Sequence, residues 1–280
     1  MHEYIKGIKS VSSCLSVAKR KVIKLVTYDR NNGLSTSMII DRCKKNGIPI
    51  EYSTPHTMNI MLKKAGDDGE GHQNYILKVK EMGEARPLSD RELKEGGDYL
   101  VLYNLTDPQN LGAIIRSVQY IFGSSLMIIL VGKQSLINGK PSVLRASAGA
   151  MEQYWDNGVR RYPASIKTLI SEAQDKFINV IGTEGSTLFC DSDGSKNSIF
   201  SIKKLKDPIH HQKAKRGTLV IMGSEGLGIG KDNLNLCNYS LSIRSFNNNL
   251  KIDDDPLYHL DSLNVSVSAG IILANWFSLP

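Results

Sequence analysis

The chain has 280 residues, of which 41% are hydrophobic and 22% are charged. This composition is typical of a soluble globular protein with one large or two ordinary domains. No apolar run reaches the roughly 18 residues of a membrane-spanning helix, so no transmembrane helix is expected. The net charge of +7 comes mostly from residues 1–97, which carry 17 Lys and Arg against 12 Asp and Glu. This basic excess is equally compatible with a nucleic-acid partner and with a solubilising surface.

The four cysteines form no recognisable metal or redox motif. They lie far apart and include no CxxC pair: Cys14, Cys43, Cys190 and Cys237. Reduced, partly buried thiols are therefore expected, as in an intracellular protein, and no metal-ligand cluster is visible. The first residues resemble neither a secretory signal nor an Arg- and Ser-rich transit peptide.

Residues 1–80 are predicted to form a small α/β domain. The expected strands are Val22–Tyr28, Ile48–Tyr52 and Tyr75–Lys80, and the expected helices are Val11–Val17, Ser35–Asn46 and Thr57–Lys64. Residues 29–33 are expected to form a turn. Pro49 favours an edge position for its strand, because proline cannot donate a ladder hydrogen bond. Lys and Arg recur through the domain, which indicates a recognition role. The polar residues 81–97 have the composition of a linker.

From residue 98 onward, strands and helices are predicted to alternate, which indicates a mainly parallel α/β sheet. The expected strands are Tyr99–Tyr103, Leu126–Val131, Phe177–Ile181, Leu219–Met222 and Tyr239–Ile243, and the expected helices are Asn110–Phe122, Ser142–Met151 and Asn264–Trp276. Two long polar loops are expected at Gly185–Gly217 and Arg244–Leu260, and their compositions favour disorder.

The helix beginning near Asn110 carries Arg116, which the sequence flanks with Ile115 and Val118. We therefore expect the stem of Arg116 to be partly buried, and a buried guanidinium needs a partner. Glu225 is the candidate. Taken by itself, this helix favours a purely structural Arg–Glu pair over a functional one.

A glycine-rich segment, Gly223–Gly230, follows a predicted strand. Its spacing satisfies neither the dinucleotide-binding pattern nor the P-loop pattern. Glycine allows backbone N–H groups to approach a ligand closely, but a tight turn without a ligand is equally consistent with the segment.

The final helix begins with polar residues and continues with apolar residues at helical spacing. Ser262 and Asn264 can cap it. The small side chains of Ser266, Ser268 and Gly270 would let a ligand or another backbone come close.

Three segments, Asn104–Ser117, Val220–Gly228 and Ser262–Ile271, resemble in order the three motifs of the SpoU (TrmH) branch of the SPOUT RNA methyltransferases. Arg145–Ala150 is also similar to the family, and residues 1–80 resemble its RNA-recognition domain. The likeness is greatest to the subgroup that methylates a guanosine ribose in large-subunit rRNA, mitochondrial members included.

The resemblance implies an α/β fold with a SPOUT parallel sheet and a C-terminal trefoil knot, preceded by the small RNA-recognition domain. The changes of pattern described above predict domain limits of 1–80, 81–97 (linker) and 98–280. The resemblance also implies S-adenosylmethionine as methyl donor and a homodimer. No metal is needed for this chemistry, and no membrane partner is expected. The implied catalytic residues are Asn110, Arg116, Glu225, Ser262 and Asn264. The implied cofactor-binding residues are Gly182, Thr183, Gly223, Ile243 and Leu263.

In such a site the resemblance assigns Arg116 to the ribose 2′-hydroxyl. A guanidinium with a pKa above about 12 is a poor base, so we expect Arg116 to position the hydroxyl and stabilise developing negative charge. The sequence departs from the family at Ile243-Arg244-Ser245, where Ile-Pro-Met is usual, in the insertion that follows, and at Asn74, where Gly is usual.

Two other functions remain open. A tRNA substrate would keep the chemistry, whereas an RNA-binding assembly factor would have lost it. The basic first domain favours rRNA over tRNA. The long insertions favour a eukaryotic, mitochondrial protein whose targeting segment is absent from this chain, with a cytoplasmic location as the alternative.

Overall fold

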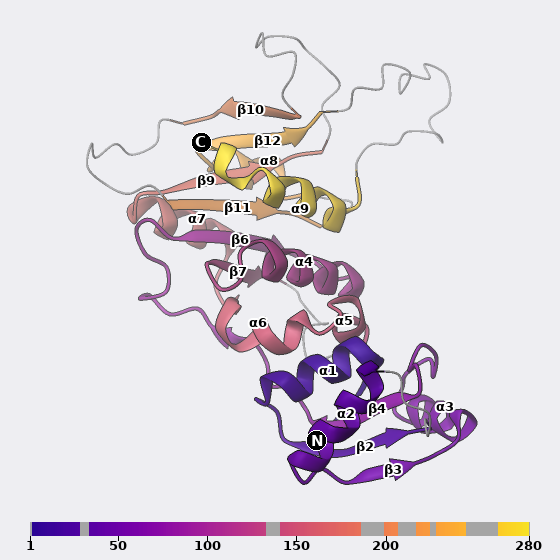
Figure 1. The fold of residues 1–280 in the computed structure, drawn as a ribbon. Helices are drawn as coiled ribbons and strands as arrows, with labels where there is room; N and C mark the ends of the chain where they lie inside the picture. The colour runs from indigo at the N-terminus through magenta and orange to yellow at the C-terminus, as the bar shows by residue number, and fades with distance from the viewer. Residues whose placement is uncertain are drawn as a thin grey trace, which may run out of the picture. The chain divides into compact units, whose positions relative to one another are not determined.

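A computed structural model describes residues 2–28, 34–132, 141–185, 199–206, 217–224, 228–244 and 263–279, without the side chains of residues 34–36 and Pro141. Packing divides the chain into two compact units (Figure 1). One comprises Met1–Ala85, Asp107–Gly123 and Ser135–Asn157, and the other comprises Arg86–Thr106, Ser124–Gln134 and Gly158–Pro280. These units follow contacts rather than sequence order, and the domain limits given above stay a prediction.

The first unit contains a four-stranded sheet of order β1-β4-β2-β3. Its strands are β1 (His2–Lys6), β2 (Val22–Thr27), β3 (Ile50–Tyr52) and β4 (Tyr75–Lys80), and the helices between them are α1 (Ile8–Val17), α2 (Leu34–Lys45) and α3 (Pro55–Lys64). β3 pairs parallel with β2 and lies at the edge, as Pro49 predicted, while the other pairs are antiparallel. Residues 29–33, the expected turn, lie outside the described residues.

Strand β1 was not expected from the sequence. It contributes only five residues, and only its last two are buried. Its pairing with β4, which joins Ile5 to Leu77, makes it a strand. A short segment of this kind has too little alternation to be distinguished without its partner.

Three further helices belong to the first unit: α4 (Pro108–Ile121), α5 (Pro141–Ala146) and α6 (Ala150–Gly158). The single helix expected at Ser142–Met151 is wrong. Ala148 and Gly149 adopt left-handed conformations, with φ of 49° and 93°, and this reversal separates α5 from α6. Gly149 uses its carbonyl to accept a hydrogen bond from Ser13 Oγ of α1 at 2.8 Å.

The second unit contains an eight-stranded sheet of order β10-β12-β9-β11-β6-β7-β8-β5. The strands are β5 (Arg86–Pro87), β6 (Asp98–Tyr103), β7 (Leu126–Val131), β8 (Val159–Tyr162), β9 (Ile178–Thr183), β10 (Phe200–Lys204), β11 (Gly217–Met222) and β12 (Tyr239–Ile243). All neighbours pair in parallel except β10 with β12. The expectation of a mainly parallel α/β sheet is confirmed.

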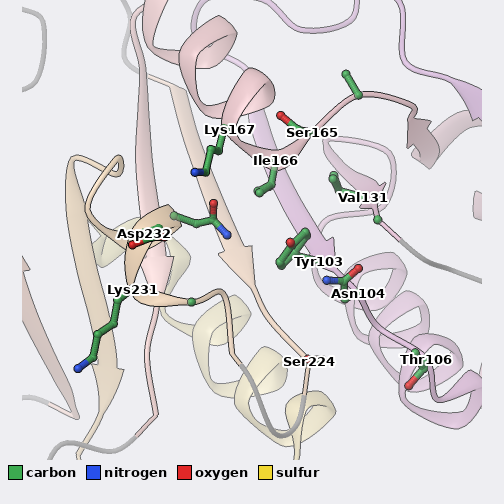
Figure 2. Close-up of a pocket in the computed structure, with 14 residues that line it drawn as sticks. Tyr103, Asn104, Thr106, Val131, Ser165, Ile166, Lys167, Ser224, Lys231 and Asp232 are labelled. Atoms are coloured by element: carbon green, nitrogen blue, oxygen red, sulfur yellow. The ribbon is translucent and has the colours of Figure 1, made fainter.

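The helices of the second unit lie on both faces of this sheet. They are α7 (Ile166–Asp175), α8 (Lys231–Leu234) and α9 (Val265–Ala274), followed by a 3₁₀ helix, Trp276–Ser278. Figures 1 and 2 show α7 and α9 on opposite faces. Helix α7 buries Leu169 and Ile170 against Val101, Ile129 and Val180, which point to the same side of their strands.

Five elements of this unit, besides the closing 3₁₀ helix, were not foreseen: β5, β8, β10, α7 and α8. β8 contains Arg160, a charged residue that the sequence alone would place at the surface but that is buried. The Arg160 guanidinium pairs with Glu92 at 2.7 Å, and its positive charge lowers the pKa of Glu92 to about 2. β10 lies inside the expected loop Gly185–Gly217, so that expectation is wrong for residues 200–204. Residues 186–198, 207–216 and 245–262 are not among those described.

Candidate functional site

Four of the expected cofactor-binding residues lie at one edge of the sheet. Strands β12, β9 and β11 are adjacent and parallel, with Gly182 opposite Ile221 and Thr183 opposite Leu241. The carboxyl ends of these strands therefore carry Gly182 and Thr183, Gly223, and Ile243 side by side. In open parallel sheets this edge is where ligands bind.

Close packing explains the glycine at position 223. The chain folds back after β11, where Ser224 and Gly228 form a bridge and Gly228 N donates to Ser224 O at 3.0 Å. A Cβ on Gly223 would overlap the backbone of Gly228 and stand 2.5 Å from Ile229 N. Only glycine permits this turn, which leaves backbone groups at the surface of the strand edge.

Gly182 and Thr183 also contribute to the packing and hydrogen bonding of the sheet. A Cβ on Gly182 would stand 2.6 Å from the side chain of Ile229, so the strand passes too close to it for a larger residue. Thr183 Oγ1 donates to Ile221 O at 2.9 Å and so ties β9 to β11. A ligand at this edge would therefore meet the half-buried Thr183 and Gly223 rather than Gly182, which is buried.

The start of α9 shows that Asn264 caps the helix. Asn264 Oδ1 accepts hydrogen bonds from Ser266 N at 2.8 Å and from Ser266 Oγ at 2.6 Å. Leu263, immediately before it, is exposed. Two of the expected catalytic residues, Ser262 and Glu225, lie outside the described part of the chain, so the expected pairing of Glu225 with Arg116 stays a prediction.

Helix α4 presents Asn110 and Arg116 in different environments. Asn110 is only 5% exposed, and the N-cap is Asp107, whose carboxylate accepts from Gln109 N at 2.9 Å. The expected partial burial of Arg116 is wrong. Ile115 and Val118 are fully buried, but Arg116 projects from the opposite face of the helix and is exposed. Among the described residues it has no hydrogen-bond or ion-pair partner.

The second unit also contains an open groove that the sequence did not reveal (Figure 2). Its volume is about 1140 Å³, and it lies at the carboxyl ends of β6, β7 and β11 and the starts of α7 and α8. Its lining is Tyr103, Asn104, Thr106, Val131, Gly132, Ala164–Lys167, Ser224 and Gly230–Asn233. None of the five expected cofactor-binding residues lines it. The lining comes from five separate segments, which no single motif could indicate.

Comparison with known proteins shows which family the chain belongs to. The profile of the SpoU rRNA Methylase family matches residues 98–274, a span that includes β6 to β12 and α9. The chain belongs to this family. As a SpoU methylase it is a methyltransferase, and the resemblance inferred from its three motifs is confirmed.

Two curated relatives illustrate the range of similarity. The 23S rRNA (guanosine-2′-O-)-methyltransferase RlmB of Haemophilus influenzae is 25% identical over 279 residues, which cover 98% of this chain and 96% of the relative. The mitochondrial rRNA methyltransferase 1 of Dictyostelium discoideum is 31% identical over 175 residues, 62% of this chain. The aligned part spans only 28% of that longer relative.

A solved structure shares the fold. The AdoMet-bound rRNA methyltransferase from Sinorhizobium meliloti superposes with a TM-score of 0.61 at 19% identity, covering 100% of this chain and 88% of that one. That relative contains the cofactor expected here. Within the described part of this SpoU methylase, no group of three or more His, Cys, Asp and Glu could hold a metal ion. No described helix is long and apolar enough to cross a membrane.

Proposed function

We propose that this SpoU methylase transfers a methyl group from S-adenosylmethionine to a ribose 2′-hydroxyl, that of a guanosine, in mitochondrial large-subunit rRNA. One observation carries the proposal: Gly182, Gly223 and Ile243 meet at the carboxyl edge of three adjacent strands. The names of the Haemophilus and Dictyostelium relatives support the substrate and the compartment.

The residues at this edge fit S-adenosylmethionine. Gly182 and Gly223 lie where a side chain cannot be accommodated. The half-buried Thr183 and Gly223 would offer backbone groups to an amino acid and a nucleoside. Gly182, Thr183, Gly223, Ile243 and Leu263 would hold the cofactor, which supplies an electrophilic methyl group on sulfur. This chain's own contribution is to align the acceptor oxygen with that methyl group.

Arg116 is proposed to act on the acceptor hydroxyl. It is exposed and has no partner in the described part of the chain, so its five N–H donors are available to a ribose oxygen and an adjacent phosphate. A permanent cation at this point stabilises the negative charge that develops as the hydroxyl loses its proton. Asn110, Glu225, Ser262 and Asn264 would orient Arg116 and the ribose.

The proposal includes a homodimer and a C-terminal trefoil knot. The chain end around α9 supports the dimer because it exposes apolar side chains. Val267 of α9 is 50% exposed, Leu263 just before the helix is 44% exposed, and Phe277 of the 3₁₀ helix is 87% exposed. The order β12-β9-β11, which is not the order of the sequence, is compatible with a knotted chain end.

The first unit is proposed to contain the RNA-recognition domain. Helices α2 and α3 both end in basic residues, namely Arg42, Lys44, Lys45, Lys63 and Lys64. Such clusters neutralise backbone phosphates. A tRNA substrate, or an assembly factor without catalysis, would use the same basic surface.

The test is methyl transfer from labelled S-adenosylmethionine to large-subunit rRNA or tRNA, followed by mapping of the modified ribose. We expect one methylated guanosine in rRNA, and we expect Arg116→Ala to reduce transfer at least about 100-fold, as loss of a charge-stabilising group does. Arg91→Ala, which removes another exposed arginine, is the matched control. Methylation of tRNA alone would refute the substrate, and full activity of Arg116→Ala would refute its role.

A further inference from the structure

The groove in Figure 2 lies beside the proposed cofactor edge without coinciding with it. In the order β12-β9-β11-β6-β7, the cofactor edge uses the first three strands and the groove uses the last three. They share only the end of β11, where Gly223 belongs to the cofactor edge and Ser224 lines the groove.

The α7 side of the groove offers positive charge. Lys167 stands in the first turn of α7, directly after the N-cap Ser165 and Ile166. Its side chain is exposed and forms no hydrogen bond or ion pair with any described residue. Figure 2 shows it projecting from α7 toward the side of the groove formed by Asp232. Because Asp232 would repel an anion, a phosphate would lie close to α7.

An unsatisfied amide lies on the opposite wall. Asn233 Nδ2 donates to Ile229 O at 2.7 Å, whereas Asn233 Oδ1 is buried and has no hydrogen-bond partner within the described residues. A buried acceptor left in this state is unfavourable.

The remaining lining matches the other parts of a nucleotide. Tyr103 is half-buried at the end of β6, and an aromatic ring in that position provides a stacking surface for a base. Thr106 and Ser224 add hydroxyl groups on the side nearest the turn that follows β11. The groove is open, and its volume exceeds the roughly 300–1,000 Å³ of a small-molecule pocket, so a passing strand fits it better than a free metabolite.

We propose that this groove binds a nucleotide of the substrate RNA that flanks the methylated one, with its phosphate on Lys167 and its base on Tyr103. The inference rests on the proposed function. It adds a second contact with the RNA strand, formed by the sheet itself and independent of the basic first domain.

The experiment measures RNA affinity at several salt concentrations, KM and kcat for RNA, and affinity for S-adenosylmethionine. We expect Lys167→Ala to weaken RNA binding about 5- to 10-fold and to lower the salt slope by about one. Tyr103→Ala should raise the KM for RNA about 10-fold, and Tyr103→Phe, which keeps the ring, should not. Affinity for S-adenosylmethionine should not change in any variant.

Lys203→Ala is the matched control, because Lys203 is an exposed lysine on β10 at the far end of the sheet order. Unchanged RNA affinity and salt slope in Lys167→Ala would overturn the inference. A variant that loses affinity for S-adenosylmethionine instead of affinity for RNA would also overturn it. Displacement of RNA by micromolar guanosine monophosphate would show a pocket for a free nucleotide and would also overturn it. RNA binding without methyl transfer by the wild-type protein would refute the proposed function. The affinity measurements on the variants would still show whether the groove binds RNA.

Discussion

At the scale of single residues, backbone geometry explains why motif positions carry the amino acids they do. Gly223 followed a strand in the sequence, but a ligand-binding loop and a simple tight turn were equally consistent with it. The structure shows the reason for glycine, since the backbone of Gly228 and Ile229 occupies the space of its side chain. Asn264 has a different structural reason, because its side chain caps α9 by accepting from Ser266 N.

Gly223→Ala tests this geometry. The added methyl group cannot fit against Gly228 and Ile229, so the turn must open and the strand edge must change shape. We expect affinity for S-adenosylmethionine to fall at least about 10-fold by calorimetry, while circular dichroism keeps the α/β signal. Gly185→Ala is the control, because nothing lies within 4 Å of its added Cβ and its φ is ordinary. Cofactor affinity unchanged by Gly223→Ala would contradict the assignment of this turn.

At the scale of elements, a buried charge network joins the N-terminal strands and helices to α6. Arg20 pairs with Glu3 of β1, donates to Glu152 of α6 at 2.8 Å and donates to Lys80 O of β4 at 2.6 Å. The three charged side chains are 8%, 12% and 2% exposed. Burial raises the pKa of Glu3 and of Glu152, and Arg20 acts against that rise.

Arg20→Met should leave two buried carboxylates without their cation. We expect a loss of about 3–5 kcal/mol of unfolding free energy at pH 7, measured by urea denaturation. Both carboxyl pKa values lie above their ordinary 4.5 in the folded protein, so stability is lost as pH rises from about 4.5 through the folded values. Without Arg20 the pKa values of Glu3 and Glu152 rise further, so both carboxyls are more often neutral at pH 5. The variant's loss of unfolding free energy should therefore be smaller at pH 5 than at pH 7.

Arg42→Met is the control for this prediction, because Arg42 is exposed and its side chain bonds only to Ser16 Oγ among the described residues. Its effect on unfolding should be slight at both pH values. A deficit of Arg20→Met that is the same at pH 5 and pH 7 would mean that the two carboxylates do not sense the loss of the guanidinium.

At the scale of the whole molecule, the apolar residues that α9 leaves exposed indicate an interface with a second copy of the chain. Val265, Ala269, Ile272 and Leu273 are buried, yet apolar side chains also cover the exposed side of the helix and of the 3₁₀ turn after it. A helix that is hydrophobic all round is normally covered on all sides. A second copy of the chain would provide that cover.

Val267→Glu should therefore shift the protein from dimer to monomer in size-exclusion chromatography with light scattering, because a carboxylate would have to be buried in the interface. Met38→Glu is the control, since it places the same charge on an exposed apolar residue of α2. A monomeric wild-type protein, or a dimer that survives Val267→Glu, would refute the assignment of α9 to the interface.

The sequence by itself determined the alternating strands and helices, the parallel sheet, the edge position of β3 and the family. These follow from local patterns: β-branched strands, helical periodicity, a proline at a strand start, and three short motifs. Each pattern is carried by neighbouring residues and so can be read along the chain.

Only the tertiary structure decided the rest. β8 and β1 exist because distant segments pair with them and bury their charges, as Glu92 does for Arg160. The exposure of Arg116 depends on which side of α4 is covered, which its apolar sequence neighbours did not reveal. The groove is formed where five separate segments end at one edge of the sheet. Such features arise from contacts between residues far apart in the chain, and local periodicity carries no information about those contacts.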